Sequence, residues 1–204
     1  MSDAHAIPAE AHGAASEHTL VKFGMWLFLA SEVMFFGGFF SSYMITRLGM
    51  KPGVVEAWQE ELKGNRPLAA INTLVLIVSS LTMVMAVAAA RRGIKNRTVL
   101  FLGLTSLCGV IFLIVKFFEY GAKISHDHLP KTNVLYAFYY MMTGFHGLHV
   151  IGGLIALWIF MCLVSKKTAE YTGEANYGNI ESMGLYWHFV DLVWVFLFPL
   201  MYLI

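Results

Sequence analysis

Apolar residues are concentrated in five long stretches of the chain, separated by polar segments that contain most of the charges, glycines and prolines. Each stretch reaches or exceeds the ~20 residues that an α-helix needs to cross a bilayer. The pattern therefore predicts an all-α polytopic membrane protein, a bundle of five transmembrane helices in residues 22–204 after a flexible tail in residues 1–21. The predicted spans are about residues 22–45, 68–90, 99–121, 135–164 and 183–204.

Two of the predicted spans carry polar faces. His146 and His149 are three residues apart in the fourth span, and His188 and Asp191 have the same spacing in the fifth, so each pair shares one side of a helix. Lipid cannot satisfy the hydrogen-bonding atoms of these side chains, so they are expected to point into protein. Hydrogen bonds between packed helices satisfy them without a metal, and the residues favour such a polar packing network.

A metal or haem site is the alternative for these histidines. His146 and His149 can ligate one metal ion with a third ligand from the last span. A bis-histidine haem instead needs one ligand from each of two helices, which His149 and His188 can supply. The residues alone leave both alternatives open. Two further groups are expected to be solvated rather than metal-bound: His5, His12 and His18 in the tail, and His126, Asp127 and His128 in the link before the fourth span.

Charged residues also fall inside the spans. Glu32 lies near the middle of the first span, where a charge costs about 2.5–3.5 kcal/mol on insertion scales. It must be protonated, paired or close to water, and it serves either to handle protons or to join helices through a hydrogen bond. Lys116 and Glu119 lie near the end of the third span. They can pair and extend towards the headgroups, or they can contact lipid headgroups directly.

Composition and charge support the membrane interpretation. Only 13% of the 204 residues are charged and 58% are hydrophobic, whereas soluble domains have about 25% charged residues. The formal net charge of +1 does not favour a nucleic-acid partner. Four basic residues occupy the short link between the second and third spans, which predicts a cytoplasmic N-terminus and a C-terminus on the outer side. They are Arg91, Arg92, Lys95 and Arg97.

Three motifs resemble a known family. Residues 24–36 (GMWLFLASEVMFF), 143–150 (TGFHGLHV) and 186–194 (YWHFVDLVW) are similar, in this order, to the signatures of subunit III of haem-copper terminal oxidases. The similarity extends to Pro67, to Asn72 and Thr73, and to Glu119 and Tyr120, so it covers nearly everything after the tail.

The resemblance implies a subunit without catalytic, cofactor-binding or metal-binding residues of its own. In that family subunit I holds the haems and copper, and subunit III packs against it, holds phospholipids and sustains proton uptake. The resemblance thus overrules haem ligation by His149 and His188. It matches Glu32 to the family's intramembrane glutamate, and His146, His149, His188 and Asp191 to its polar positions. The implied location is a bacterial inner membrane, with subunits I and II as partners.

The chain departs from the longer form of the family, which has seven spans. The resemblance implies that the first two are missing here and that a partner subunit I can supply them. A cytochrome c oxidase is the leading interpretation, and the length of the acidic side chain at Glu32 favours it slightly. A quinol oxidase, a nitric-oxide reductase with a similar accessory subunit, and, in a different class, a haem-binding membrane cytochrome remain the alternatives.

Overall fold

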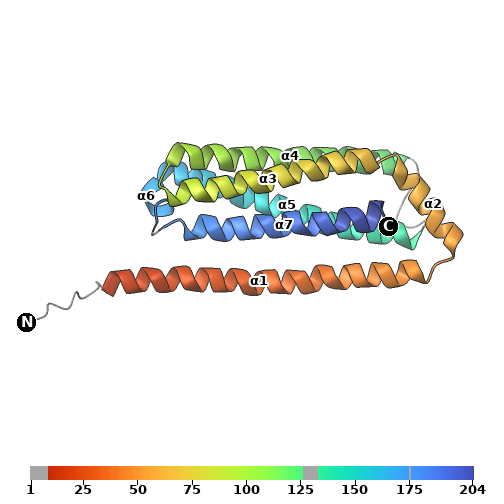
Figure 1. The fold of residues 1–204 in the computed structure, drawn as a ribbon, viewed down its shortest axis with the longest axis horizontal. Helices are drawn as coiled ribbons and strands as arrows, with labels where there is room; N and C mark the ends of the chain where they lie inside the picture. Colours follow the sequence, from red (N-terminus) through yellow and green to blue (C-terminus); the bar gives the residue numbers. More distant parts are fainter. Residues whose placement is uncertain (1–8, 126–132, 175) are drawn as a thin grey trace, which may run out of the picture.

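The computed structural model describes residues 9–125, 133–174 and 176–204, with side chains from Leu20 onward except residues 124–132 and 175. Every regular element in these ranges is helical (Figure 1). The helices are α1 (Ala9–Leu48), α2 (Pro52–Lys63), α3 (Arg66–Arg91), α4 (Lys95–Ser125), α5 (Val134–Lys166), α6 (Thr168–Tyr171) and α7 (Gly178–Tyr202).

Five of these helices are long and apolar enough to cross a membrane, which confirms the predicted fold class. Their apolar segments are Leu20–Leu48, Arg66–Arg91, Lys95–Lys123, Val134–Lys166 and Gly178–Tyr202. Each overlaps one predicted span. The helix α1 begins at Ala9, well before the predicted start at residue 22. Whether part of residues 1–21 forms a mobile tail stays a prediction.

A tight turn joins α3 to α4. Gly93 has a positive φ of 72°, a conformation that glycine adopts without steric cost. The amide of Gly93 donates to the carbonyl oxygen of Ala90, and the amide of Ile94 donates to that of Ala89, both at 3.0 Å. These bonds satisfy the last carbonyls of α3 and turn the chain back on itself. The two helices therefore pack side by side along their length (Figure 1).

The spans differ in how far the chain itself covers them. In α7, half of the most apolar 18-residue window is buried, and this helix packs against α3, α5 and α1. In α1 only 11% of the corresponding window is buried. Figure 1 shows α1 along one side of the bundle, next to α7 and away from α3 and α4. Most of α1 is thus left for lipid or another protein to cover.

Glycines let one large side chain enter the middle of the bundle. Trp187 of α7 is fully buried. A Cβ on Gly109 of α4 would lie 2.8 Å from its Cη2 atom, and a Cβ on Gly153 of α5 would lie 2.9 Å from its Cζ3 atom. The indole nitrogen Nε1 donates to Oγ of Ser79 on α3 at 3.0 Å. Trp187 therefore joins α3, α4, α5 and α7, and only residues without a side chain leave room for it.

The short helix α2 crosses the end of the bundle between α1 and α3 (Figure 1). Its two buried side chains, Trp58 and Leu62, are one turn apart on the face towards the bundle. The ring of Trp58 meets that of Tyr136 edge-on, with centroids 4.7 Å apart. α2 closes this end of the bundle through these contacts.

Candidate functional site

A carboxyl and an imidazole from different helices meet at the side of the bundle. Oε2 of Glu32 on α1 lies 3.0 Å from Nε2 of His149 on α5. The other ring nitrogen, Nδ1, lies 2.8 Å from the carbonyl oxygen of Phe145. A carbonyl only accepts, so Nδ1 carries a hydrogen. The contact with Glu32 then requires a second proton between the two side chains, because two lone pairs would repel each other.

The surroundings of this pair are aromatic. The ring of Phe36 meets the imidazole of His149 at 5.3 Å between centroids, and Tyr186 donates to the backbone carbonyl of His149 at 2.9 Å. The side chains of Glu32 and His149 are still 17% and 19% exposed. The contact between Glu32 and His149 therefore lies in an aromatic environment but is partly accessible from the outside of the chain.

His188 and Asp191 make separate contacts with α3. Nδ1 of His188 is 2.6 Å from Oγ of Ser80. Oδ2 of Asp191 accepts from Oγ of Ser79 at 3.3 Å, next to the indole nitrogen of Trp187. The other carboxyl oxygen, Oδ1 of Asp191, is buried and has no hydrogen-bond partner among the described residues. These two side chains hold α7 against α3.

His146 has different surroundings, although it is on the same side of α5 as His149. It is 1% exposed and lies between the rings of Phe112 and Trp194, at 5.6 and 5.2 Å between centroids. Neither ring nitrogen has a hydrogen-bond partner in the described part of the chain. The four predicted polar residues thus form three arrangements: His149 faces α1, His188 and Asp191 face α3, and His146 packs among aromatic rings.

Lys116 and Glu119 lie inside the protein, paired with each other. Nζ of Lys116 donates to Oε2 of Glu119 at 2.7 Å, and the two side chains are only 9% and 1% exposed. Tyr139 of α5 and Tyr202 of α7 both donate to Oε1 of Glu119, at 2.8 and 2.5 Å. These hydrogen bonds join α4, α5 and α7. A contact of Lys116 and Glu119 with lipid headgroups stays a prediction.

A second lysine completes this cluster. Nζ of Lys123 is 3.8 Å from Oε1 of Glu119 and 3.7 Å from the centre of the Tyr139 ring. Nζ of Lys116 similarly lies 4.4 Å from the centre of a Trp194 ring. One carboxylate therefore faces two ammonium groups, and aromatic faces supply the remaining stabilisation of the cations.

Lys116 and Glu119 were predicted from the sequence as a polar pair, whereas Lys123, Tyr139 and Tyr202 were not predicted. Lys123 could have been predicted, because it follows Glu119 by four residues and therefore shares its face of α4. The tyrosines belong to helices whose rotation about their axes is set by packing. The pattern of a single sequence does not determine that rotation.

The described residues contain no group of three His, Cys, Asp or Glu side chains that could hold a metal ion. His149 and His188, the two candidate haem ligands, contact Glu32 and Ser80 respectively and do not face each other. His126, Asp127 and His128 lie outside the described residues, as do the side chains of His5, His12 and His18.

Fold and site together define a polytopic helical membrane protein whose ionisable side chains are held between neighbouring helices. Residues 6–204 match the family described as cytochrome c oxidase subunit III. The chain belongs to this family, the third subunits of haem-copper oxidases, which confirms the resemblance seen in the three sequence motifs.

Relatives in the family come from different types of oxidase. The chain is 36% identical to a cytochrome c oxidase subunit 3 of Synechocystis over 97% of its length and 81% of the relative's. It is 36% identical to a probable cytochrome c oxidase subunit 3 of Mycobacterium leprae, covering 91% of the chain and 88% of the relative. A cytochrome bo(3) ubiquinol oxidase subunit 3 of Pseudomonas aeruginosa is 29% identical over 100% of the chain and 94% of the relative.

Proposed function

We propose that this chain sustains proton uptake by the catalytic subunit of a cytochrome c oxidase, and that the Glu32–His149 pair carries this role. The supporting observation is the 3.0 Å contact between Oε2 of Glu32 and Nε2 of His149, a hydrogen bond between a carboxyl and an imidazole from different helices. The pair connects α1 to α5 and is partly exposed at the side of the bundle. A proton held there can pass to or from a neighbouring subunit without crossing the core of this chain.

The two groups of the pair stabilise each other in either proton position. With the proton on the carboxyl, Nε2 of His149 accepts a hydrogen bond, and with the proton on the ring the two form an ion pair. Moving the proton between them therefore breaks no contact with the surrounding helices. This property suits a group that loads and releases protons over many turnovers.

Cytochrome c as the electron donor is supported by the names of the two relatives that are 36% identical. A quinol donor is the second candidate, because the Pseudomonas aeruginosa relative, named as a ubiquinol oxidase subunit, covers the whole chain. In both cases subunit I is proposed as the main partner, with subunit II also present, and the haems and copper lie in the partner chains. The proposed location is the inner membrane of a bacterium.

The orientation proposed for the chain follows from its basic link. Arg91, Arg92, Lys95 and Arg97 all lie near the turn between α3 and α4, the end of the bundle where the apolar part of α1 begins (Figure 1). Short basic loops favour the cytoplasm. We place this end inside and the α2 end outside. A subunit I that carries two spans beyond its core would supply the two helices of the seven-span form.

The test compares oxidase complexes purified with Glu32→Gln, Glu32→Ala or Glu60→Gln in this subunit. Glu60 is an exposed carboxyl on α2 that pairs with Lys63, so Glu60→Gln controls for loss of a paired carboxylate at the surface. Initial turnover should be the same in all complexes, whereas activity should decay faster during prolonged turnover with either Glu32 variant. Gln keeps a hydrogen bond to His149 but cannot release a proton. Endurance equal to that of the wild type in Glu32→Gln would refute the proposal and leave Glu32 a purely structural role.

A further inference from the structure

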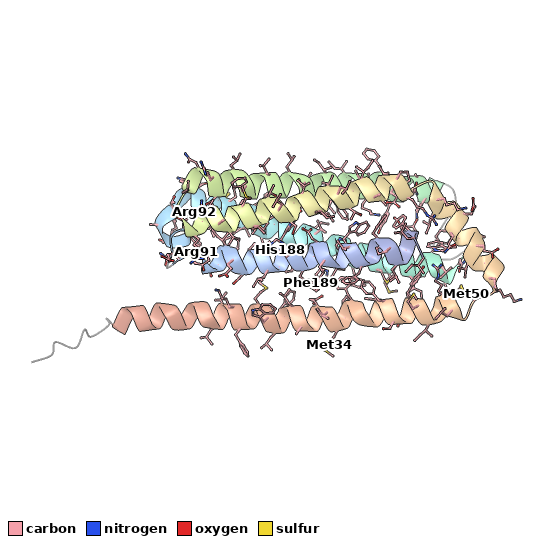
Figure 2. All side chains as sticks on the ribbon, viewed as in Figure 1. Met34, Met50, Arg91, Arg92, His188 and Phe189 are labelled. Atoms are coloured by element: carbon pink, nitrogen blue, oxygen red, sulfur yellow. The ribbon has the colours of Figure 1, made fainter. Side chains whose placement is uncertain are left out.

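Aromatic residues hold α1 against α7 on both sides of Glu32. Phe28 and Phe36 are four residues before and after Glu32, so each lies one turn away on the same face of α1. The ring of Phe28 lies 6.1 Å from that of Tyr186 between centroids. The ring of Phe36 lies 6.4 Å from that of Phe189, which Figure 2 shows on the side of α7 that faces α1. Because Tyr186 and Phe189 are three residues apart, one face of α7 contacts α1 on both sides of Glu32.

Tyr186 reaches α5 as well as α1. Its hydroxyl donates to the main-chain carbonyl oxygen of His149 at 2.9 Å. A carbonyl oxygen has two lone pairs, so it can accept this bond in addition to the amide bond within α5. A single side chain of α7 therefore contacts both helices whose carboxyl and imidazole meet, α1 through Phe28 and α5 through His149.

Two adjacent glycines in α5 leave room for Tyr186 at this point. Gly152 and Gly153 follow His149 by three and four residues. A Cβ on Gly153 would lie 3.1 Å from Cε1 of Tyr186, and a Cβ on Gly152 would lie 3.7 Å from its hydroxyl oxygen. Successive glycines also weaken the interior of a helix, because each loses more backbone entropy than other residues on becoming helical. The turn that follows His149 is therefore open to Tyr186 and gains rigidity from its hydrogen bond.

The position of the His149 ring depends on the backbone of α5. Nδ1 of the ring lies 2.8 Å from the carbonyl oxygen of Phe145, one turn earlier in the same helix. Nε2 is then directed at Oε2 of Glu32, at 3.0 Å. Because the ring is held by its own helix, a shift or rotation of α5 at His149 moves Nε2 with it. Hydrogen bonds weaken steeply when their distance or angle departs from the optimum, so a residue that fixes α5 here controls the contact with Glu32.

We propose that Tyr186 is a positioning residue for the Glu32–His149 pair. Its hydroxyl fixes the turn of α5 that carries His149, and its ring fixes α1 through Phe28, one turn before Glu32. Tyr186 thus acts on the pair through the α5 backbone and through a neighbouring ring. This role rests on the proposed function for its effect on turnover, whereas the geometry of the pair can be measured independently of turnover.

Infrared spectroscopy of purified oxidase complexes tests the geometry of the pair. The bands of the Glu32 carboxyl, protonated or ionised, are identified as those lost in Glu32→Gln. Tyr186→Phe removes the hydroxyl and keeps the ring against Phe28, so any effect reports the hydrogen bond to the backbone of His149. The Glu32 bands should shift in Tyr186→Phe, because the contact between Glu32 and His149 loosens. Bands that stay at their wild-type positions in Tyr186→Phe would overturn the proposal.

Two further variants separate positioning from packing. Tyr177→Phe is the control, because Tyr177 lies at the beginning of the same helix and contacts Lys22 and Arg91 through its ring; it should shift no Glu32 band. Replacement of Tyr186 by 3-fluorotyrosine nearly preserves the shape of the side chain and makes its hydroxyl a stronger donor. The Glu32 bands should then shift in the direction opposite to that in Tyr186→Phe. A shift in the same direction would mean that only packing around the ring matters, and it would overturn the proposal.

Prolonged turnover measures what the positioning by Tyr186 contributes to the proposed function. Tyr186→Phe should shorten the time to half-loss of activity by up to about fivefold, the factor that corresponds to one neutral hydrogen bond. In complexes that already carry Glu32→Gln, Tyr186→Phe should shorten this time no further; an additional loss would mean that Tyr186 acts elsewhere, and it would overturn the proposal.

The two proposals fail independently. Shifted Glu32 bands in Tyr186→Phe together with wild-type endurance in Glu32→Gln would remove the proposed function and leave the positioning role of Tyr186 intact. Unshifted bands in Tyr186→Phe together with short endurance in Glu32→Gln would remove the positioning role and leave the proposed function intact.

Discussion

The sharpest stability prediction concerns the carboxylate at the centre of the Lys116–Glu119 cluster. Glu119→Gln removes the carboxylate that two buried lysines face, Lys116 at 2.7 Å and Lys123 at 3.8 Å. Removing one partner of a buried ion pair lowers the free energy of unfolding by about 3–5 kcal/mol, because the other charge stays buried without its partner. The amide of the new side chain also brings a second donor towards the ammonium group of Lys116.

Lys116→Met should lower the free energy of unfolding less than Glu119→Gln does. The carboxylate then retains Lys123 at 3.8 Å and the hydroxyls of Tyr139 and Tyr202. Lys116→Met removes two hydrogen bonds, from Nζ to Oε2 of Glu119 and to the hydroxyl of Tyr202. A hydrogen bond to a charged group corresponds to about 1.5–3 kcal/mol, but no charge is left without a partner. The double variant carries both Lys116→Met and Glu119→Gln, so it has no unpaired ammonium group at position 116. Its loss of unfolding free energy should therefore be smaller than the sum of the two single losses by about 0.5–3 kcal/mol.

The assay is unfolding of the subunit by sodium dodecyl sulfate in mixed micelles, followed by tryptophan fluorescence. Lys63→Met is a matched control, because Lys63 forms an exposed pair with Glu60 at the same three-residue spacing; exposed pairs contribute about 0–1 kcal/mol. Additive effects in the double variant, or a cost below about 1 kcal/mol for Glu119→Gln, would refute the idea that this cluster fastens α4 to α5 and α7.

Three further substitutions test the packing of the bundle. Gly153→Ala should destabilise the fold by about 1–3 kcal/mol in the same unfolding assay, because its Cβ would lie 2.9 Å from Trp187; Gly144→Ala, with open space at its Cβ, should have no such cost. His146→Phe should be neutral or stabilising, because both ring nitrogens lack partners among the described residues; a loss of stability would reveal a polar partner such as bound water. His188→Ala should leave Oγ of Ser80 unsatisfied at a cost of about 1–3 kcal/mol, and less of the subunit should remain with subunit I in the purified complex; normal association would contradict this expectation.

The sequence was sufficient to predict the spans because the bilayer sets both their length and their composition. The fourth predicted span, residues 135–164, differs from the observed apolar segment Val134–Lys166 by only one or two residues at each end. These features are encoded within a few residues of where they occur, so a single sequence reveals them.

The partners of the polar residues could not be predicted in the same way. The histidines at 146 and 149 share one face of a helix, yet one packs among rings and the other meets Glu32, more than a hundred residues away along the chain. Which helices are neighbours depends on packing around Trp187 and on the glycines that admit it. Helical periodicity identifies the polar face but not the helix opposite it.

Glu119 and Glu32 differ in exposure and in the number of contacts that depend on their charge. Glu119 is 1% exposed and accepts from Lys116, Tyr139 and Tyr202, so it cannot take up a proton without weakening contacts between helices. Glu32 is 17% exposed, has His149 as its ionisable partner among the described residues, and lies on the least buried of the five long apolar helices. A carboxyl in that position is poorly suited to hold the fold together. Under the proposed function, Glu32 can exchange protons with whatever covers α1, whereas Glu119 cannot do so without loosening α4 from α5 and α7.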